Sequence, residues 1–307
     1  MSGFGVIDPG ILSQFQDAGR FGYHAMGLTT GGPVDGEAFY WANRLVGNQP
    51  GETVIEVAVG GLKLESEVAT SIVVTGAVLP LTINGHTKAL WQSHRVAPGD
   101  VVDLRYAERG MRAYVATAGG FTGRPVLGST ATVLREGIGE ALVPGQILEC
   151  AAIDRAPGAL PLECVPRYED EVPLRMVPGY QFDRFSHESR EKFLGGLYTV
   201  SNRSDRMGIC LEGPAVEAPS EGLLSEGICL GAVQVPPDGQ PIVLMNDRQT
   251  IGGYPKLGSV LSADLWKLGQ CRPGSRIRFE TLALEKAVEV LQMGREAREA
   301  VELKESR

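Results

Sequence analysis

The amino-acid sequence predicts a mainly β fold with few helices. Short runs rich in β-branched residues, bounded by Gly, Pro, Asp or Asn, recur along the chain, as at residues 53–59, 71–74 and 242–245. A Pro-Gly pair followed by alternating apolar residues occurs at positions 98, 144 and 273, which is typical of a turn that leads into a strand. The chain has 40 glycines among 307 residues, nearly twice the usual share of about 7%, and this indicates many tight turns.

Local signals place further elements in order along the chain. Asp35 is expected to cap a helix whose apolar residues recur at helical spacing and which ends at Gly47-Asn48. The Asn84-Gly85 pair predicts a two-residue hairpin over residues 79–90. A short helix is expected over residues 186–194. The amphipathic segment from Leu284 to the C-terminus, rich in Glu, Lys and Arg, predicts a solvated terminal helix.

A domain boundary is expected between residues 154 and 173. Four prolines and an acidic run in this segment disfavour regular backbone hydrogen bonding. We therefore expect an N-terminal β-rich subdomain over residues 1–160, a C-terminal β-rich subdomain over 161–284 and a helical tail over 285–307. No strict repeat relates the two halves, so a duplicated architecture stays open.

Composition excludes several classes of protein. Hydrophobic residues make up 43% and charged residues 21%, which fits neither a disordered nor a membrane-spanning chain. No apolar run reaches membrane-spanning length and no basic residue precedes Arg20, so we expect a cytoplasmic location with no membrane partner. The net charge of −8, with scattered positive residues, argues against a nucleic-acid partner. The five cysteines lack zinc or redox spacing and are expected to be reduced core thiols.

The common catalytic signatures are absent from the sequence. It contains no P-loop, no G-x-G-x-x-G, no G-x-S-x-G and no H-E-x-x-H motif. The four histidines are scattered, so no metal site is expected from this chain. A Met-Lys-Met segment of the kind that accepts biotin is also missing, and no covalently bound biotin is expected.

The densest polar block is DRQTIGGYPK, residues 247–256, directly after an apolar strand at 241–245. Arg248 and Lys256 supply positive charge and Asp247 could hold a metal ion or orient a nucleophile, so these three are the expected catalytic residues. Adjacent glycines let backbone N–H groups turn toward an anion. The expected substrate-binding or anion-binding residues of this block are Gln249, Thr250, Gly252, Gly253 and Tyr254. The structural alternative is a glycine-rich hairpin with an ordinary salt bridge.

Two further blocks are candidate binding segments. In SNRSDRMG, residues 201–208, Arg206 and its neighbouring arginine could grip a carboxylate or phosphate, or one of them could pair with Asp205. In the glycine-rich segment 15–35, Gln16, Asp17 and Arg20 are either hydrogen bonders that brace a loop or ligand contacts.

These blocks occur in an order that resembles a known family. The motifs are FQDAGRFGY, the Gly-Gly-Pro-x-Asp turn, ANRLVGN, IEVAVGGLKL, TAGGF, LGST, SDRMG, the long segment 225–256 and CRPGSRIRF. The sequence resembles the C-type subunit of the bacterial ATP-dependent 5-oxoprolinase, also described as the Kip antagonist, allophanate hydrolase subunit 2 or the A/B part of a biotin-dependent carboxyltransferase domain. The likeness runs from about residue 5 to 280.

The resemblance implies two β-rich subdomains with cyclophilin-like β-barrel character and a chain that works beside other subunits. The implied partners are a protein similar to the B-type subunit of 5-oxoprolinase or the Kip inhibitor, and a lactam-utilisation subunit. In this reading ATP phosphorylates the lactam oxygen of 5-oxoproline and water opens the ring to glutamate. Arg248, Lys256 and the Gly252 and Gly253 amides would stabilise phosphoryl charge, with Asp247 as a base or Mg²⁺ ligand. ATP with Mg²⁺ is expected in the complex, without a motif in this chain.

The resemblance leaves two other functions open. The chain could be the carboxyltransferase half that acts on urea or another amide with carboxybiotin, supplied by a different module. It could also be a non-catalytic antagonist that binds a kinase-inhibiting partner protein.

Overall fold

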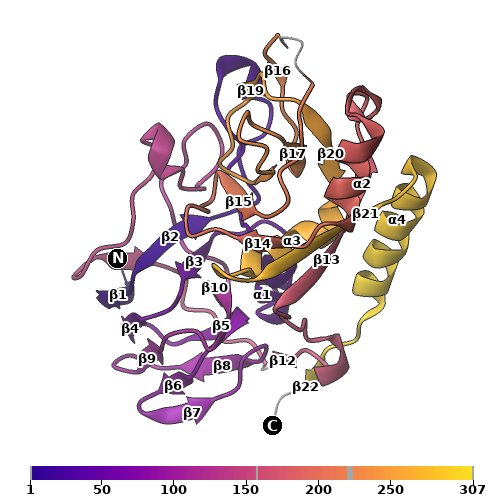
Figure 1. Ribbon diagram of the computed structural model, residues 1–307. Coiled ribbons are helices and arrows are strands. Elements are labelled where there is room, and N and C mark those ends of the chain that lie inside the picture. Colours follow the sequence, from indigo (N-terminus) through magenta and orange to yellow (C-terminus); the bar gives the residue numbers. More distant parts are fainter. Residues whose placement is uncertain (1, 157, 220–223, 306–307) are drawn as a thin grey trace. The chain divides into compact units, whose positions relative to one another are not determined.

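The computed structural model describes residues 2–156, 158–219 and 224–305, and in them the fold is mainly β as expected (Figure 1). The chain divides into two compact units. The first comprises Met1–Arg20, Gly31–Tyr168 and Val301–Arg307, and the second comprises Phe21–Thr30 and Glu169–Ala300. The longest stretch of the first unit therefore ends within the proline-rich segment 154–173.

The first unit contains two antiparallel sheets. The six-stranded sheet has the order β11 (Ile147–Glu149), β1 (Gly3–Pro9), β4 (Leu62–Ser66), β9 (Val101–Leu104), β6 (Leu81–Ile83) and β7 (His86–Lys88). The five-stranded sheet has the order β2 (Leu12–Gln16), β3 (Val54–Ala58), β10 (Arg109–Thr117), β5 (Thr70–Val78) and β8 (Ser93–Val96). The pair β12 (Gly158–Ala159) and β22 (Lys304–Glu305) and the short helices η2 (Leu134–Glu136) and η3 (Leu162–Cys164) complete the unit.

The main core of the first unit draws on both sheets. Leu64 and Leu104 of the six-stranded sheet and Ile55 and Val115 of the five-stranded sheet belong to one buried cluster. A second cluster forms where helix α1 (Gly36–Leu45) packs on the same five-stranded sheet. Strand β5 is therefore buried at every position but its last, which explains why it carries no charged residue, because a strand covered on both faces has no solvent side.

The second unit is built on a closed seven-stranded barrel. Its order is β13 (Glu171–Pro178), β20 (Lys256–Val260), β17 (Ala232–Gln234), β18 (Ile242–Leu244), β15 (Gly208–Glu212), β14 (Tyr198–Val200) and β21 (Arg276–Thr281). The flanking elements are η1 (His24–Met26), η4 (Phe182–Arg184), α2 (His187–Gly195), α3 (Ser262–Gln270), α4 (Leu284–Ala300) and a separate pair of short strands, β16 (Glu226–Gly227) and β19 (Ile251–Gly252).

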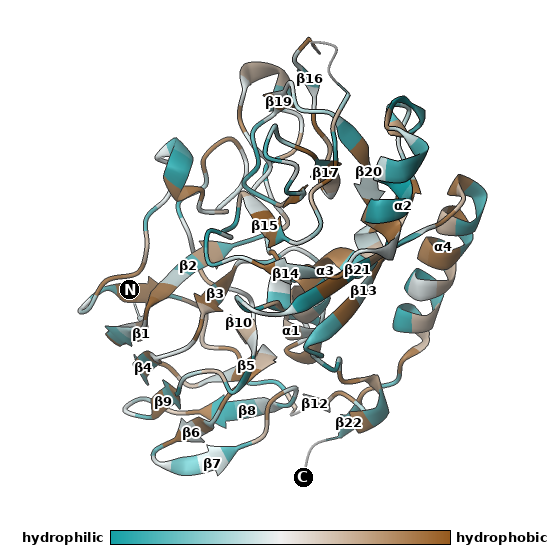
Figure 2. Cartoon of the chain, viewed as in Figure 1, coloured by the Kyte–Doolittle hydropathy of each residue, from teal (hydrophilic) through white to brown (hydrophobic). Residues whose placement is uncertain are grey.

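Alternation along the barrel strands fixes which side chains form the barrel core. In β21 only Ile277 and Phe279 are buried and their neighbours are exposed, and Figure 2 shows the corresponding change of hydropathy along β13 and β21. The Phe279 ring stacks on Phe193 of α2 with ring centroids 4.5 Å apart. The apolar period of two predicted after the third Pro-Gly turn is thus confirmed.

The elements with strong local signals are confirmed. The Asp35 side chain accepts a hydrogen bond from the Ala38 amide at the start of α1. Ser186 caps α2 in the same way. Asn84 and Gly85 both have positive φ in the turn between β6 and β7, as a two-residue hairpin of this type requires.

The expectations for the C-terminal part need correction. The terminal helix α4 ends at Ala300, because Val301 and Leu303 are partly buried against the core of the first unit. Helix α3 was not expected. Its N-cap is Leu261, whose side chain makes no capping hydrogen bond, so the strongest helix-start signal is missing. Among the described residues, no helix combines the length and apolar character needed to cross a membrane.

Candidate functional site

The polar block 247–256 divides between two surroundings within the second unit. Asp247 and Arg248, directly after β18, are each only 5% exposed. Lys256 begins β20 and lines a cavity. Of the three residues predicted to act together in catalysis, Asp247 and Arg248 are therefore buried, whereas Lys256 lines a cavity.

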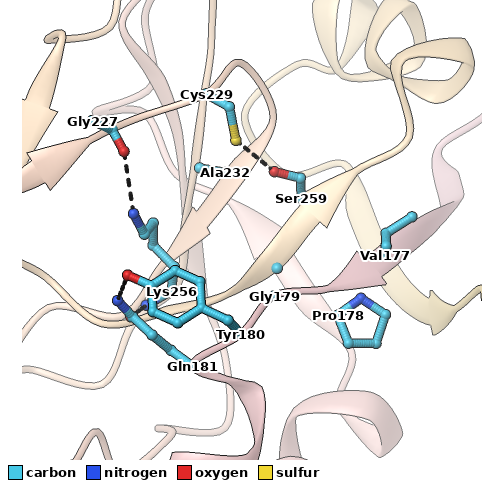
Figure 3. Close-up of a pocket in the computed structure, with 11 residues that line it drawn as sticks. Val177, Pro178, Gly179, Tyr180, Gln181, Gly227, Cys229, Ala232, Lys256 and Ser259 are labelled. Atoms are coloured by element: carbon cyan, nitrogen blue, oxygen red, sulfur yellow. Dashed lines mark hydrogen bonds between the residues drawn. The ribbon is translucent and has the colours of Figure 1, made fainter. Parts of the chain in front are cut away.

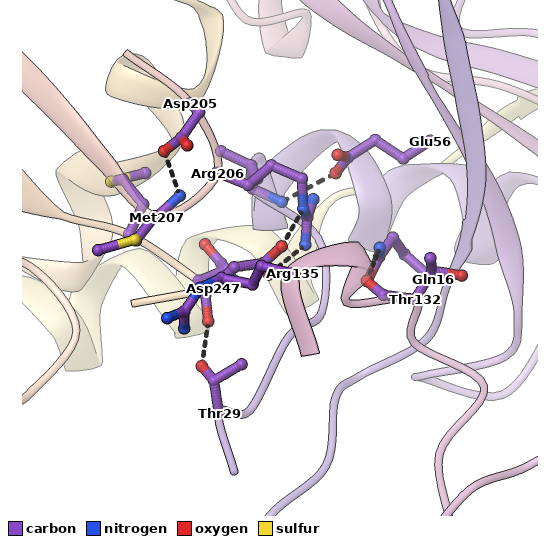
Figure 4. Close-up of polar contacts among 12 residues, drawn as sticks. Gln16, Thr29, Glu56, Thr132, Arg135, Asp205, Arg206, Met207 and Asp247 are labelled. Atoms are coloured by element: carbon purple, nitrogen blue, oxygen red, sulfur yellow. Dashed lines mark hydrogen bonds and ion pairs between the residues drawn. The ribbon is translucent and has the colours of Figure 1, made fainter. Parts of the chain in front are cut away.

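Asp247 is held in an ion pair. Its two carboxylate oxygens accept from Nε and Nη2 of Arg206, each at 2.9 Å, and its backbone N–H donates to the Arg206 carbonyl (Figure 4). Asp205 does not pair with Arg206, since its carboxylate accepts from the backbone N–H groups of Met207 and Gly208. The carboxylate that Arg206 was expected to grip is thus Asp247 of this chain.

Arg248 is bound by backbone carbonyls. Its Nε donates to the Ile228 carbonyl at 3.2 Å and its Nη1 to the Met245 carbonyl at 3.4 Å. Burial lowers the pKa of this guanidinium, because desolvation disfavours the charged form. These contacts tie the loop to the residue after β16 and to the residue after β18.

The middle of the block supports the pairing of β16 with β19. The Thr250 carbonyl accepts from the Ile228 amide at 3.0 Å, and Gly252 pairs with Glu226. A Cβ atom at Gly252 would lie 2.5 Å from the end of the Ile228 side chain, so a larger residue here would require Ile228 to shift. Gln249 is half-buried, while Gly253 and Tyr254 are exposed.

Lys256 belongs to a polar cluster at the edge of the cavity. Its ammonium forms an ion pair with Glu226 and donates to the Gly227 carbonyl at 3.4 Å. The Lys256 amide donates to the Gln181 side-chain oxygen at 2.7 Å. The pKa of Glu226 is lowered, first by the hydrogen bond from Lys256 and then by the one from Tyr180.

The cavity has a volume of about 330 Å³ and lies on the barrel (Figure 3). The residues that line it are Val177, Pro178, Gly179, Tyr180, Gln181, Gly227, Cys229, Ala232, Lys256, Gly258 and Ser259. Cys229 Sγ lies 2.8 Å from Ser259 Oγ. All five cysteines are free, but Cys229 is exposed, so the expectation of core thiols is wrong for this residue.

Sequence reasoning found Lys256 and missed the other polar groups of the cavity. Tyr180 and Gln181 lie about 75 residues from Lys256 in the chain, in a Pro-Gly-Tyr-Gln segment that reads only as a turn. They reach the cavity because β13, which precedes them, pairs with β20. No local sequence pattern predicts the pairing of these two strands.

The predicted residues near the N-terminus brace a loop of the first unit. Arg20 is 1% exposed and its guanidinium donates to the carbonyls of Val126, Ser129 and Ala131. The Asp17 carboxylate accepts from Ser129 Oγ and the Thr130 amide. This is the loop-bracing alternative among the two that the sequence left open.

Gln16 contributes to the same brace. It is fully buried and its side-chain amide donates to the Thr132 carbonyl at 2.9 Å (Figure 4).

A resident metal is not suggested by the described part of the chain, where no three His, Cys, Asp or Glu side chains are grouped so that they could hold an ion. Asp247, the proposed Mg²⁺ ligand, has both oxygens engaged by Arg206. Its geometry therefore fits an ion pair better than a metal ligand.

Comparisons with known proteins agree on a family. The model of the family described as carboxyltransferase domain, subdomain A and B, matches residues 26–281. The chain is 34% identical to the C-type subunit of 5-oxoprolinase from Escherichia coli, over 94% of both chains. It resembles the crystal structure of TTHA0988 with a TM-score of 0.84 and 35% identity, covering 91% of this chain and 55% of that one.

A second solved structure extends the likeness. The Kluyveromyces lactis urea carboxylase matches with a TM-score of 0.85 and 27% identity, covering 96% of this chain and 29% of that chain. The chain thus spans just over half of TTHA0988 and less than a third of the urea carboxylase.

Proposed function

Since this chain belongs to the family of carboxyltransferase domains of the subdomain A and B type, we propose that it is one of the subunits of an ATP-dependent 5-oxoprolinase. The proposed reaction opens the lactam ring of 5-oxoproline to glutamate at the expense of ATP. The observation that carries the proposal is the similarity to the C-type subunit of 5-oxoprolinase over 94% of both chains. The proposed partners are a protein like the B-type subunit or the Kip inhibitor and a lactam-utilisation subunit, in the cytoplasm.

The cavity on the barrel is the proposed place where this chain contacts substrate. Its volume of about 330 Å³ lies at the lower end of the range of small-molecule sites. Lys256 is assigned to substrate binding and not to the developing phosphoryl charge, because Glu226 neutralises its ammonium. Tyr180 and Gln181 add uncharged donors beside it.

The other predicted catalytic residues are assigned supporting roles. Asp247 and Arg248 hold the loop through an ion pair and two backbone carbonyls. The transfer of phosphate from ATP to the lactam oxygen needs contacts that we assign to the partner subunits.

A carboxyltransferase acting with carboxybiotin is the second candidate function. The observation in its favour is the structural similarity to urea carboxylase over 96% of this chain. It would transfer a carboxyl group from carboxybiotin to the nitrogen of urea or another amide. That reading requires a biotin carrier, whereas the oxoprolinase reading does not.

The test is reconstitution with the two proposed partners, the B-type protein and the lactam-utilisation protein. We expect glutamate and ADP to form in equal amounts from 5-oxoproline and ATP, with no turnover by this chain alone and no effect of avidin. Loss of activity with avidin and its recovery with excess biotin would establish the second candidate. Turnover by the isolated chain would refute the assignment of ATP contacts to the partners.

A further inference from the structure

Three hydrogen-bond donors on the barrel converge on one carboxylate. The Tyr180 hydroxyl donates to one oxygen of Glu226, and the Gln181 side-chain amide donates to the other at 2.6 Å. The Lys256 ammonium forms an ion pair with the oxygen that Gln181 contacts. Charge-assisted hydrogen bonds of this kind are about twice as strong as neutral ones, so these donors together form a carboxylate receptor.

Gln181 is positioned independently of Glu226. Gln181 is 1% exposed, its oxygen accepts from the Lys256 amide at 2.7 Å, and its nitrogen donates to the Tyr180 hydroxyl at 2.8 Å. Tyr180 and Gln181 follow β13 and Lys256 begins β20, and these two strands are hydrogen-bonded neighbours in the barrel. The barrel therefore sets the backbone positions of the three donors, and the Lys256 ammonium also donates to the Gly227 carbonyl of β16.

Glu226 is held less firmly than Gln181 and Lys256. It lies on β16, a two-residue strand that pairs with the two-residue strand β19 in a sheet separate from the barrel. Its side chain is 34% exposed, compared with 13% for Lys256. A two-stranded pair of this size is only marginally stable, so the carboxylate can leave while the barrel stays intact.

The three donors all line the cavity of about 330 Å³. Val177 and Ala232 supply apolar wall, and Figure 3 shows the neighbouring pair Cys229 and Ser259 as a second group of hydrogen-bonding side chains on the same cavity. A ligand here would meet a carboxylate receptor and a separate neutral polar pair.

We propose that Tyr180, Gln181 and Lys256, together called the carboxylate cradle, form a binding site that Glu226 occupies until a small carboxylic acid replaces it. The ligand class is a small acid with a second, uncharged hydrogen-bonding group that reaches Cys229 and Ser259. Its identification as the lactam acid 5-oxoproline rests on the proposed function, but the cradle itself does not.

The exchange conserves charge, and this gives the cradle its selectivity. When one carboxylate replaces another, Lys256 stays paired and the displaced Glu226 enters water. A neutral lactam offers no carboxylate to the Lys256 ammonium and would forgo the charge-assisted hydrogen bonds of the cradle. The cradle therefore accepts 5-oxoproline and rejects 2-pyrrolidone, the same ring without its carboxylate.

The experiment is calorimetric titration of the full chain with 5-oxoproline, 2-pyrrolidone and acetate. Glu226→Gln removes the internal competitor. When Glu226 occupies the cradle in about nine molecules of ten, the apparent affinity for an added acid is about tenfold weaker. We expect Glu226→Gln to bind 5-oxoproline and acetate about tenfold more tightly than wild type, with no binding of 2-pyrrolidone. The matched control Glu289→Gln removes the exposed pair with Lys286 on α4 and should bind as wild type does.

Three results would overturn the cradle. They are no binding of either acid by wild type and Glu226→Gln, equal binding of 2-pyrrolidone and 5-oxoproline, and unchanged affinity in Glu226→Gln with a lowered melting temperature. The proposed function is tested separately by turnover of the reconstituted complex. Acid binding that depends on Glu226, without turnover of 5-oxoproline, would support the cradle and refute the proposed function. Turnover without acid binding would support the proposed function and refute the cradle.

Discussion

The buried polar groups of the first unit and the polar groups at the cavity of the second unit are used in different ways. In the first unit, Arg20 donates to three backbone carbonyls, and Glu56 accepts from the Val34 amide at 3.0 Å and the Tyr114 hydroxyl at 2.7 Å. Burial raises the pKa of Tyr114 well above its usual value, and Glu56 adds to the effect. In the second unit, Lys256 faces a cavity and is paired with the partly exposed Glu226.

The hydrogen-bond partners of a polar side chain separate a structural polar motif from a binding site. A side chain whose partners are backbone groups of a neighbouring loop is committed to that loop, and removing it leaves buried groups unpaired. A side chain whose partner is another, more exposed side chain beside a cavity can exchange that partner. Both units contain sequence segments dense in polar residues, so the sequence alone does not separate the two roles. The hydrogen-bond partners of each side chain do.

The largest expected effect tests the structural side of the comparison. Arg20→Leu leaves the carbonyls of Val126, Ser129 and Ala131 without their donor, at about 1–3 kcal/mol for each buried group left unpaired. We expect the free energy of unfolding in urea to fall by about 3–5 kcal/mol. Arg95→Leu, which removes an exposed pair with Asp154, is the control and should lose less than about 1 kcal/mol.

The opposite pattern for Arg20 would break the comparison. If Arg20→Leu unfolds at the wild-type urea concentration while the reconstituted complex loses turnover, Arg20 contacts a ligand and does not brace the loop.

The next effect tests the binding side. Lys256→Met removes the charged donor of the carboxylate cradle, and hydrogen bonds to charged groups contribute about 1.5–3 kcal/mol. We expect kcat/KM of the complex to fall about 10²-fold, mainly through KM, because the substrate carboxylate is bound equally in the ground and transition states. Steady-state kinetics with 5-oxoproline measures the split, and a fall confined to kcat would assign Lys256 to the developing charge.

A third comparison lies within the block 247–256 itself. Arg248→Met removes the donors to the Ile228 and Met245 carbonyls, and we expect a loss of about 2 kcal/mol in the free energy of unfolding. Turnover of the folded complex should stay within a few-fold of wild type. Loss of turnover with unchanged stability would instead place Arg248 at the reacting groups.

Local signals explain which parts of this fold the sequence predicts. Asp35 caps α1 and Asn84-Gly85 forms the hairpin turn because the residues that make each feature are neighbours in the chain. Helix α3 was missed since Leu261 offers no cap. The end of α4 was missed because Val301 leaves the helix to bury apolar surface, which no local pattern records.

The candidate site follows the same rule. Lys256 was found from its polar block, but its meaning depends on Gln181 and Glu226, which reach it through strand pairings between distant segments. The Arg206–Asp247 pair spans 41 positions in the same way. Composition indicated where polar groups gather, and only the register of the barrel shows which of them face the cavity.

The smallest expected effect concerns the Glu226 carboxylate and sharpens the claim that it is exchangeable. Its pKa is lowered in the folded chain by the hydrogen bonds from Lys256 and Tyr180. A group whose folded pKa lies below its unfolded value of about 4.3 adds stability above that value and loses it as the pH falls through the folded pKa. With a third of the side chain exposed, solvent screening limits the contribution of the Glu226–Lys256 pair to stability to about 0.2–1 kcal/mol.

We therefore expect Glu226→Gln to lower the free energy of unfolding by this small amount at pH 6–8, and the difference between the two chains to shrink as the pH falls below about 4. Urea unfolding of both chains across that range measures it. A difference above about 2 kcal/mol would mean that Glu226 supports the fold, in which case it could not give way to a ligand.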